Sequence, residues 1–476
     1  MGGTDMRTRA ARSAVIAAAI SVLVGGCTVG PNYEKPKLPT PETYRFAEAN
    51  TQAQSLADAP WFQIFDDAVL QALIKDAIAN NLDVRVAMAH VEEARARAGI
   101  AKSYLYPQVD GSFLYGVRGA STTEDPNDTT HQSTSYGFHL SWEIDLWGRL
   151  RRGQEAAVAL ALATEQARRG VLVTLVGDVA TNYFLLRELD LQLEIARQTL
   201  RINDQTVAYF QNRLTGGVSN RLELDRIQAL REQTATAIPE IERQIAQVEN
   251  LISLLLGRPP GPITRQGLTN AEPLPPAIPP GLPASLLQRR PDVVQAEQVL
   301  VAANADIGAA KALFYPTISL TGFLGGVSGD LTSFLGGTGA LWSLAPGLVQ
   351  PLFQAGRLKQ NLAAAHARFD AALADYQKAA LNSYREVADS LITIEKLAEQ
   401  RGHRQLGVTA LQDAADLARA RYESGLASYI EILTADQQLF EQQLLLAQTL
   451  GAEFRARAEL YRALGGGWQP QPQPHP

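Results

Sequence analysis

The sequence predicts a mixed fold of long α-helices and transmembrane β-strands, in which one unit occurs twice. Three observations predict it: several motifs recur at one separation, one stretch alternates between apolar and polar residues, and one long stretch is apolar at every seventh position. The 476 residues are 46% hydrophobic and 19% charged, so the chain can form a substantial core. The net charge of -6 provides no basic footprint, and we therefore expect no nucleic-acid partner.

The amino terminus has the residue order of a secretory signal. Three arginines between positions 7 and 12 precede the apolar run Ala14–Val24, which is too short to span a bilayer, and two glycines and Cys27 follow it. This ending resembles a bacterial lipoprotein signal, which implies removal of residues 1–26 and acylation of Cys27, the only cysteine; the alternative is an ordinary signal with an incidental cysteine. Thr28, rather than Asp, implies the outer membrane by the sorting rule of such lipoproteins.

The mature chain contains one unit twice. Tyr106-Pro107 recurs 209 residues later as Tyr315-Pro316, and Gly148-Arg149-Leu150 recurs 208 residues later as Gly356-Arg357-Leu358. A Pro-rich stretch, which cannot continue a helix, separates the two copies. The expected division is a lipid-anchored extended segment at 27–67, a first repeat at 68–257, a Pro-rich linker at 258–284, a second repeat at 285–464 and a disordered tail at 465–476.

Each repeat is expected to contain two strands after its Tyr-Pro motif. Residues 135–146 alternate most clearly, with Tyr136, Phe138, Leu140, Trp142, Ile144 and Leu146 on one face and polar residues or glycine on the other. This pattern is typical of a strand that faces lipid on one side, although a half-buried strand of a soluble sheet fits it equally well. The other strands are expected at about 109–118, 317–325 and 341–350, with a polar loop at 119–134 and a Gly-rich loop at 325–339.

The number of strands constrains the assembly. An open sheet cannot lie in lipid, because the amides at its edges would have no hydrogen-bond partners. Four strands cannot close into a barrel, and single-chain membrane barrels begin at eight strands. If the strands face lipid, several copies of the chain must therefore share one barrel.

Long helices are expected to follow each pair of strands, at about 148–214 and 220–257 and again at 356–424 and 428–464. Steps of seven residues from Leu172 to Leu214 meet only leucine or valine, as the seam of a coiled coil requires. Glycines in the two turns can end one helix, while Ser219, Asn220 and Ser428 can cap the next. The residues of these hairpin tips are Gly216, Gly217, Val218, Ser219, Gly425, Leu426, Ala427 and Ser428.

Together with the runs Pro60–Asp67 and Leu286–Val293, the duplicated unit resembles the TolC-type outer-membrane efflux proteins, and in particular their NodT-like or OprM-like lipoprotein branch. The resemblance implies a homotrimer whose twelve strands form one outer-membrane barrel above a periplasmic barrel of helices, with the linker in an equatorial region. It also implies a passive exit duct for small molecules in a tripartite pump of a Gram-negative bacterium. The implied partners are a periplasmic adaptor, which would dock at the hairpin tips, an inner-membrane transporter and outer-membrane lipid.

The resemblance also implies a periplasmic aperture at the start of the last helix. Ile430 matches an apolar constriction residue, and Glu431 matches a position that is acidic in some members. Thr434 stands where Asp is usual and Gln437 where some relatives have Arg, so the Asp-to-Arg latch of the family is expected to be absent. Glu431 can equally be a solvated acid that the helix dipole favours.

Two other classes of function are weighed against a duct. The sequence contains no nucleotide, zinc-protease or hydrolase motif, and its six histidines lack ligand spacing, so we expect neither an enzyme nor a cofactor or metal. A lipid-anchored coiled-coil spacer of the cell envelope would explain Cys27 and the heptads. It would not explain the aromatic alternation at 135–146.

Overall fold

The computed structural model describes residues 28–47, 67–118, 131–265, 267, 283–328 and 340–466. Cys27 and the expected signal segment lie outside these residues, as do most of the Pro-rich linker and of the tail. The chain forms two compact units: Met1–Lys37, His90–Glu165 and Gln295–Gln377 make the first, and Leu38–Ala89, Gln166–Val294 and Lys378–Pro476 make the second.

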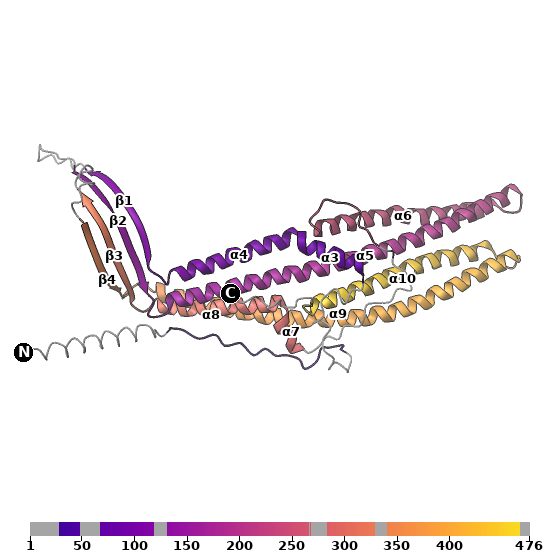
Figure 1. The fold of residues 1–476 in the computed structure, drawn as a ribbon. Helices are drawn as coiled ribbons and strands as arrows, with labels where there is room; N and C mark the ends of the chain where they lie inside the picture. Colours follow the sequence, from indigo (N-terminus) through magenta and orange to yellow (C-terminus); the bar gives the residue numbers. More distant parts are fainter. Residues whose placement is uncertain are drawn as a thin grey trace, which may run out of the picture. The chain divides into compact units, whose positions relative to one another are not determined.

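One order of elements occurs twice along the chain (Figure 1). Two helices, two strands and two long helices follow one another in each repeat, which confirms the expected fold class of a duplicated helical and β unit. The elements are α3 (Ala68–Asn80), α4 (Leu82–Ser103), β1 (Gln108–Arg118), β2 (His131–Ile144), α5 (Arg149–Thr215), α6 (Arg221–Leu255), α7 (Pro283–Arg289), α8 (Pro291–Ala312), β3 (Thr317–Ser328), β4 (Ala340–Val349), α9 (Arg357–Glu423) and α10 (Tyr429–Ala463).

The four strands form one antiparallel sheet in the order β1-β2-β3-β4 (Figure 1). Side chains of directly paired residues lie on the same face of a sheet. The register pairs Phe113 with Tyr136, Phe138 with Leu324 and Leu324 with Trp342, so a single apolar face runs across all four strands. The opposite face carries mainly polar side chains and glycine.

Two ends of the strands differ from the expectation. β2 begins at His131, inside the expected polar loop, because its first residues pair with the end of β1. β3 continues to Ser328 and thus includes residues assigned to the Gly-rich loop. Gly325 pairs with Gly137, and a Cβ added at Gly325 would lie only 2.1 Å from the backbone oxygen of Tyr136. These glycines belong to the sheet because the two backbones approach closely there.

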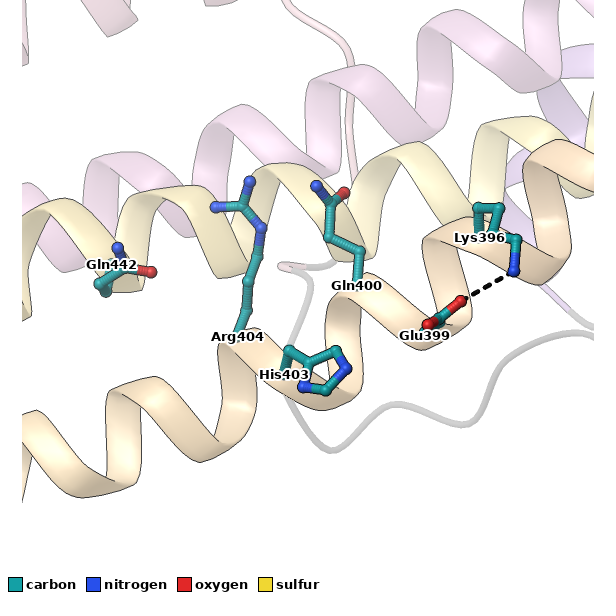
Figure 2. Close-up of a pocket in the computed structure, with 6 residues that line it drawn as sticks. All are labelled: Lys396, Glu399, Gln400, His403, Arg404 and Gln442. Atoms are coloured by element: carbon teal, nitrogen blue, oxygen red, sulfur yellow. Dashed lines mark hydrogen bonds and ion pairs between the residues drawn. The ribbon is translucent and has the colours of Figure 1, made fainter.

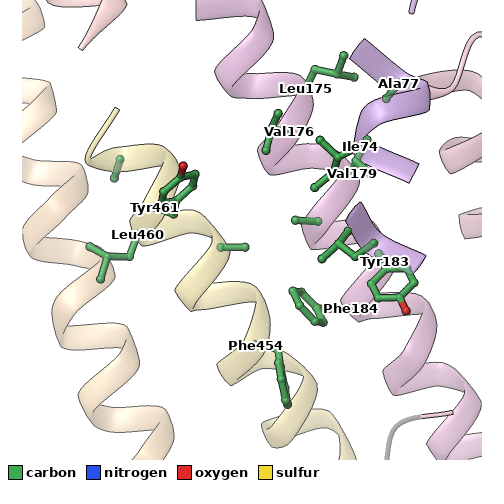
Figure 3. Close-up of a cluster of buried hydrophobic side chains, with 14 of the residues drawn as sticks. Ile74, Ala77, Leu175, Val176, Val179, Tyr183, Phe184, Phe454, Leu460 and Tyr461 are labelled. Atoms are coloured by element: carbon green, nitrogen blue, oxygen red, sulfur yellow. The ribbon is translucent and has the colours of Figure 1, made fainter. Parts of the chain in front are cut away.

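The core of the second unit lies where α3, α5 and α10 meet (Figure 3). Along α5 the heptad residues Val179 and Leu186 are fully buried, and the remaining seam residues are half-buried, which confirms the expected seam. Phe184 of α5 contacts Phe454 of α10 with ring centroids 5.1 Å apart. Tyr183 donates a 2.7 Å hydrogen bond to Asp67, whose other carboxylate oxygen caps the start of α3.

The two helical hairpins turn at the expected glycines. Gly217 has φ 71° and Gly425 has φ 74°, values that favour glycine. The side chain of Asn220 accepts a 3.0 Å hydrogen bond from the Glu223 amide and caps α6. Ser428 is the N-cap residue of α10, but its side chain makes no capping hydrogen bond, so the expectation that its side chain caps the helix is wrong. The Glu431 amide is instead bonded to the Ser428 carbonyl.

Candidate functional site

The sheet presents a large apolar surface to its surroundings. Phe113 and Phe138 are each more than 60% exposed, and Trp342 of β4 is 77% exposed. Exposure of this extent is unfavourable in water, and it is what a barrel strand presents to hydrocarbon. On the opposite face the Ser112 hydroxyl and His139 Nε2 lie 2.8 Å apart, so polar groups there hydrogen-bond one another.

Tryptophans fix the base of the sheet. The indole of Trp142 donates a 3.1 Å hydrogen bond to the Leu105 carbonyl, just before β1. The indole of Trp147 donates to the Pro316 carbonyl at 2.8 Å and stacks on Tyr315, just before β3. Trp147, just after β2, thus binds the Tyr315-Pro316 motif, and Trp142 of β2 binds the residue before Tyr106-Pro107. The second copy of the recurring motif therefore has a structural role at the base of the sheet.

The first described residues of the chain lie against this base. Val29 donates a 3.0 Å backbone hydrogen bond to Trp147. A Cβ added at Gly148 would lie 2.8 Å from the Thr28 side chain, and one at Gly30 would lie 2.4 Å from the Cα of Gly308. The residue that follows Cys27 is consequently fixed beside the start of α5, where the strands end.

The tips of the two helical hairpins pack on each other through aromatic rings. The ring centroids of Phe210 on α5 and Tyr429 on α10 lie 4.2 Å apart, and the ring of Phe210 also contacts that of Tyr422 on α9. Arg213 lies over the rings of Tyr209 and Tyr422. We call Phe210, Tyr422 and Tyr429 the aromatic clasp. It joins the α5–α6 hairpin to the α9–α10 hairpin, and sequence spacing could not have paired residues so far apart.

Burial shapes the chemistry of Tyr429. Desolvation by burial raises the pKa of Tyr429, and its hydroxyl has no hydrogen-bond partner among the described residues. The ring therefore contributes mainly through its apolar contacts.

The expected aperture residues make local contacts at the start of α10. Ile430 is 42% exposed, and its carbonyl accepts a 2.8 Å hydrogen bond from the Thr434 hydroxyl. The Glu431 carboxylate lies 3.8 Å from Arg421 of α9, and Gln437 donates to Glu441 at 3.2 Å. Within one chain, these contacts connect the expected aperture residues only to α9 and α10.

Sequence reasoning missed an ion pair beside these residues. Arg419 of α9 donates a 2.5 Å hydrogen bond to Asp436 of α10, and it also contacts Asp416. Burial raises the pKa of the Asp436 carboxyl, and the nearby Arg419 only partly opposes this effect. Arg419 and Asp436 each lie within about two or three helical turns of the same loop, so the antiparallel hairpin could have suggested the pair.

Buried ion pairs tie α10 to its neighbours further along. Glu453 is fully buried and accepts a 2.7 Å hydrogen bond from Arg401 of α9. Glu188 of α5 accepts from Arg455 of α10, and desolvation raises the pKa of the Glu188 carboxyl despite this partner. Removing one partner of such a pair leaves a buried charge, so these contacts fix how the helices pack.

A shallow pocket of about 500 Å³ lies between α9 and α10 (Figure 2). Its charged side chains include an ion pair, with Lys396 donating to Glu399 at 3.0 Å. In the described part of the chain, no three His, Cys, Asp or Glu side chains form a group that could hold a metal ion.

Comparison with known proteins identifies the family. The model of the outer membrane efflux protein family matches residues 73–258 and 282–466, which are the two repeats. The chain belongs to this family. It is accordingly an outer-membrane efflux channel and not an enzyme, as the sequence led us to expect.

Similar proteins cover nearly the whole chain. The cation efflux system protein CusC of Escherichia coli O6:H1 is 35% identical over 453 residues, which is 94% of this chain and 98% of CusC. The probable outer membrane lipoprotein SilC of Salmonella typhimurium is 34% identical over 452 residues, 94% of this chain and 97% of SilC. The structure of the outer-membrane channel OprN superposes with a TM-score of 0.83 at 30% identity, over 93% of this chain and 100% of OprN.

Proposed function

We propose that this chain forms the exit duct of a tripartite efflux system, as a homotrimer whose twelve strands close one barrel. The observation that carries the proposal is the four-stranded sheet, which has one continuous apolar face and two open edges, β1 and β4. Only pooling with other copies gives those edges partners in lipid. An inner-membrane transporter would supply the energy, and a periplasmic adaptor would bridge the two.

The cargo is not set by the duct in this proposal. A water-filled conduit passes small molecules without a fitted pocket, and the transporter selects them. CusC is named for cations, and this chain could carry cations or organic compounds according to the pump it completes.

The hairpin tips are the proposed docking surface for the adaptor. Val218 is 64% exposed and Leu426 is 74% exposed, so each tip offers an apolar side chain beside its glycine turn. Together the two tips place apolar and small polar groups at the end of the helices. The surface comprises Gly216, Gly217, Val218, Ser219, Gly425, Leu426, Ala427 and Ser428.

The start of α10 is the proposed aperture. Threefold symmetry would bring three copies of Ile430 and Glu431 around one axis, with Thr434 and Gln437 further along the same helix. Three carboxylates close together bind cations or repel one another. The exposure of Ile430 within a single chain supports a position facing the axis or a neighbouring copy.

Cys27 is the proposed lipid attachment site in the outer membrane. Its neighbour Thr28 lies against Gly148 at the base of the sheet, where acyl chains could enter the adjacent leaflet. The name of SilC, a probable outer membrane lipoprotein, supports the same assignment.

The oligomeric state and the conductance test the proposal together. Protein extracted in detergent should have the mass of three chains, and the trimer should conduct ions across a planar bilayer once its tip is opened. A monodisperse monomer would exclude a shared barrel. A trimer that never conducts, even when its tip is destabilised, would indicate the lipid-anchored spacer instead.

A further inference from the structure

The repeat fixes how the edge strands should meet in the assembly. Within one chain, β2 of the first repeat pairs with β3 of the second. In a ring of copies, β4 of one chain would meet β1 of the next, which is the same junction with the repeats exchanged. The motif offsets are 208 residues for the second strand of a repeat and 209 residues for the first. Applying them to the β2–β3 register therefore gives the register between β4 of one copy and β1 of the next.

The offsets can be checked inside the chain. The pair Gln108–Ser141 joins β1 to β2. Adding 209 to the first residue and 208 to the second gives Thr317–Val349, which is a pair observed between β3 and β4. The sequence offsets thus reproduce a strand register without adjustment.

We infer that β4 pairs with β1 of a neighbouring copy in the register that the β2–β3 junction dictates. The inference rests on the proposed shared barrel and specifies its subunit interface. Transferring Tyr136–Gly326, Gly137–Gly325, Phe138–Leu324, Leu140–Gly322, Ser141–Thr321 and Ile144–Ile318 gives these pairs, with the second residue in the neighbouring copy: Leu344–Val117, Ala345–Gly116, Pro346–Tyr115, Leu348–Phe113, Val349–Ser112 and Leu352–Val109.

Two features of this register were not used to derive it. First, it sets Leu344 and Leu348 of the apolar face opposite Val117 and Phe113, which are also apolar, whereas a slip by one residue would place them on opposite faces. The apolar surface then continues around the ring.

The second feature concerns small residues. The close approach of Gly137 and Gly325 is transferred to Ala345 and Gly116. Gly116 keeps a glycine where Gly325 stands within the chain, whereas Ala345 carries a Cβ where Gly137 has none, so the two backbones must lie slightly further apart at the junction between copies.

The register also explains where β4 ends. β2 continues three residues past its last pairing with β1, because Trp142 to Ile144 pair with β3. The matching residues 350–352 have no strand partner among the described residues of one chain, and β4 stops at Val349. Leu352 is 92% exposed and its inferred partner Val109 is 63% exposed. In the assembly β4 extends to Leu352, and the two side chains lie next to each other on the apolar face that meets lipid.

Paired cysteines test the register. One double variant combines Val349→Cys with Ser112→Cys, and the other combines Leu348→Cys with Phe113→Cys. Each places two cysteines directly opposite each other between copies. One pair is hydrogen-bonded and the other is not, and in both kinds of pair the Cα atoms lie within disulfide range. Within one chain, β1 and β4 are three strand spacings apart, about 14 Å, so only copies can be linked. Mild oxidation in membranes should give covalent trimers on a non-reducing gel. Val349→Cys combined with Asp110→Cys or Leu114→Cys, each displaced by two residues from the matched position, should give about tenfold less covalent trimer.

The outcomes separate this inference from the proposed function. A native trimer in which a displaced pair cross-links better than the matched pairs overturns the register but leaves the shared barrel. A native trimer in which no pair cross-links also overturns the register. A monomer on the native gel overturns the shared barrel as well. The unmodified chain, with Cys27 alone, controls for linkage through the natural cysteine.

Discussion

At the scale of single residues, a charge pair within one hairpin lies beside the positions of the family's Asp-to-Arg latch, which this sequence is expected to lack. Thr434 and Gln437 lack the charges of the latch. Asp436, one or two residues from them on α10, instead pairs with Arg419 of α9. No local sequence pattern relates Asp436 to Arg419, and the pair follows only once their two helices are taken as one antiparallel hairpin. Burial around the pair was equally invisible.

Asp436 should make the stability of the hairpin depend on pH. Its pKa is higher in the folded protein than the ordinary value of 3.8. In the pH interval between these two pKa values, the folded state therefore binds more protons than the unfolded state. The contribution to stability is therefore greatest at low pH and falls as the pH rises through the interval. Asp436→Asn should remove this dependence, as thermal unfolding between pH 4 and pH 7 would measure. A Tm of Asp436→Asn at pH 7 more than roughly 4 °C below that of the unmodified protein would contradict it, and Asp413→Asn, at an exposed position of α9, is the control.

Glu431 provides a test of the aperture. If three copies of this carboxylate surround the axis, Glu431→Ala should weaken the block of single-channel conductance by divalent cations severalfold, because their binding site is lost. Glu423→Ala, an exposed acid at the end of α9, is the matched control and should leave the block unchanged. An unaltered cation response in Glu431→Ala would leave this residue as a solvated acid in the first turn of the helix, which the helix dipole favours.

At the scale of elements, the sequence predicted what depends on local periodicity. The α5 seam, the glycine turns and the alternating β2 strand all follow from spacing along the chain. β3 was only partly predicted, because Gly325 and Gly326 have no side chains to alternate although their backbones pair with β2. The aromatic clasp could not be predicted, since Phe210 and Tyr429 come from different hairpins and meet only through tertiary packing.

The aromatic clasp should hold the tips of the two hairpins together. Phe210 is 1% exposed, and Phe210→Ala would remove about 3 to 5 kcal/mol of packing where α5, α9 and α10 meet. We expect a larger open fraction and larger single-channel conductance in planar bilayers, with the trimer intact. Gln211→Ala, on the next exposed position of α5, should behave as the unmodified protein. Equal conductance of Phe210→Ala and the unmodified trimer would show that the clasp does not restrain the tip.

At the scale of the whole molecule, the amino-terminal segment and the sheet agree on where the membrane lies. The apolar face of the sheet ends near Ile144 and Ile318. At this level α5 follows β2, and α8 precedes β3. Val29 is bonded to Trp147 at this level, and Gly30 packs directly on Gly308. A lipid attached one residue before Thr28 would therefore enter the leaflet at the lower rim of the barrel.

This agreement makes a prediction about the anchor. Cys27→Ser should abolish labelling by radioactive fatty acid, while the barrel keeps the trimer in the outer membrane, because strands and acyl chains are separate attachments. Gly308→Val should leave labelling intact but loosen the anchored segment, since the added side chain meets the Val29 carbonyl 2.8 Å from its Cβ. Limited proteolysis should then cut residues 28–37 in Gly308→Val and spare them in the unmodified protein. Fatty-acid labelling that persists in Cys27→Ser would place the lipid elsewhere, and loss of the trimer from the outer membrane would show that the strands alone do not hold it there.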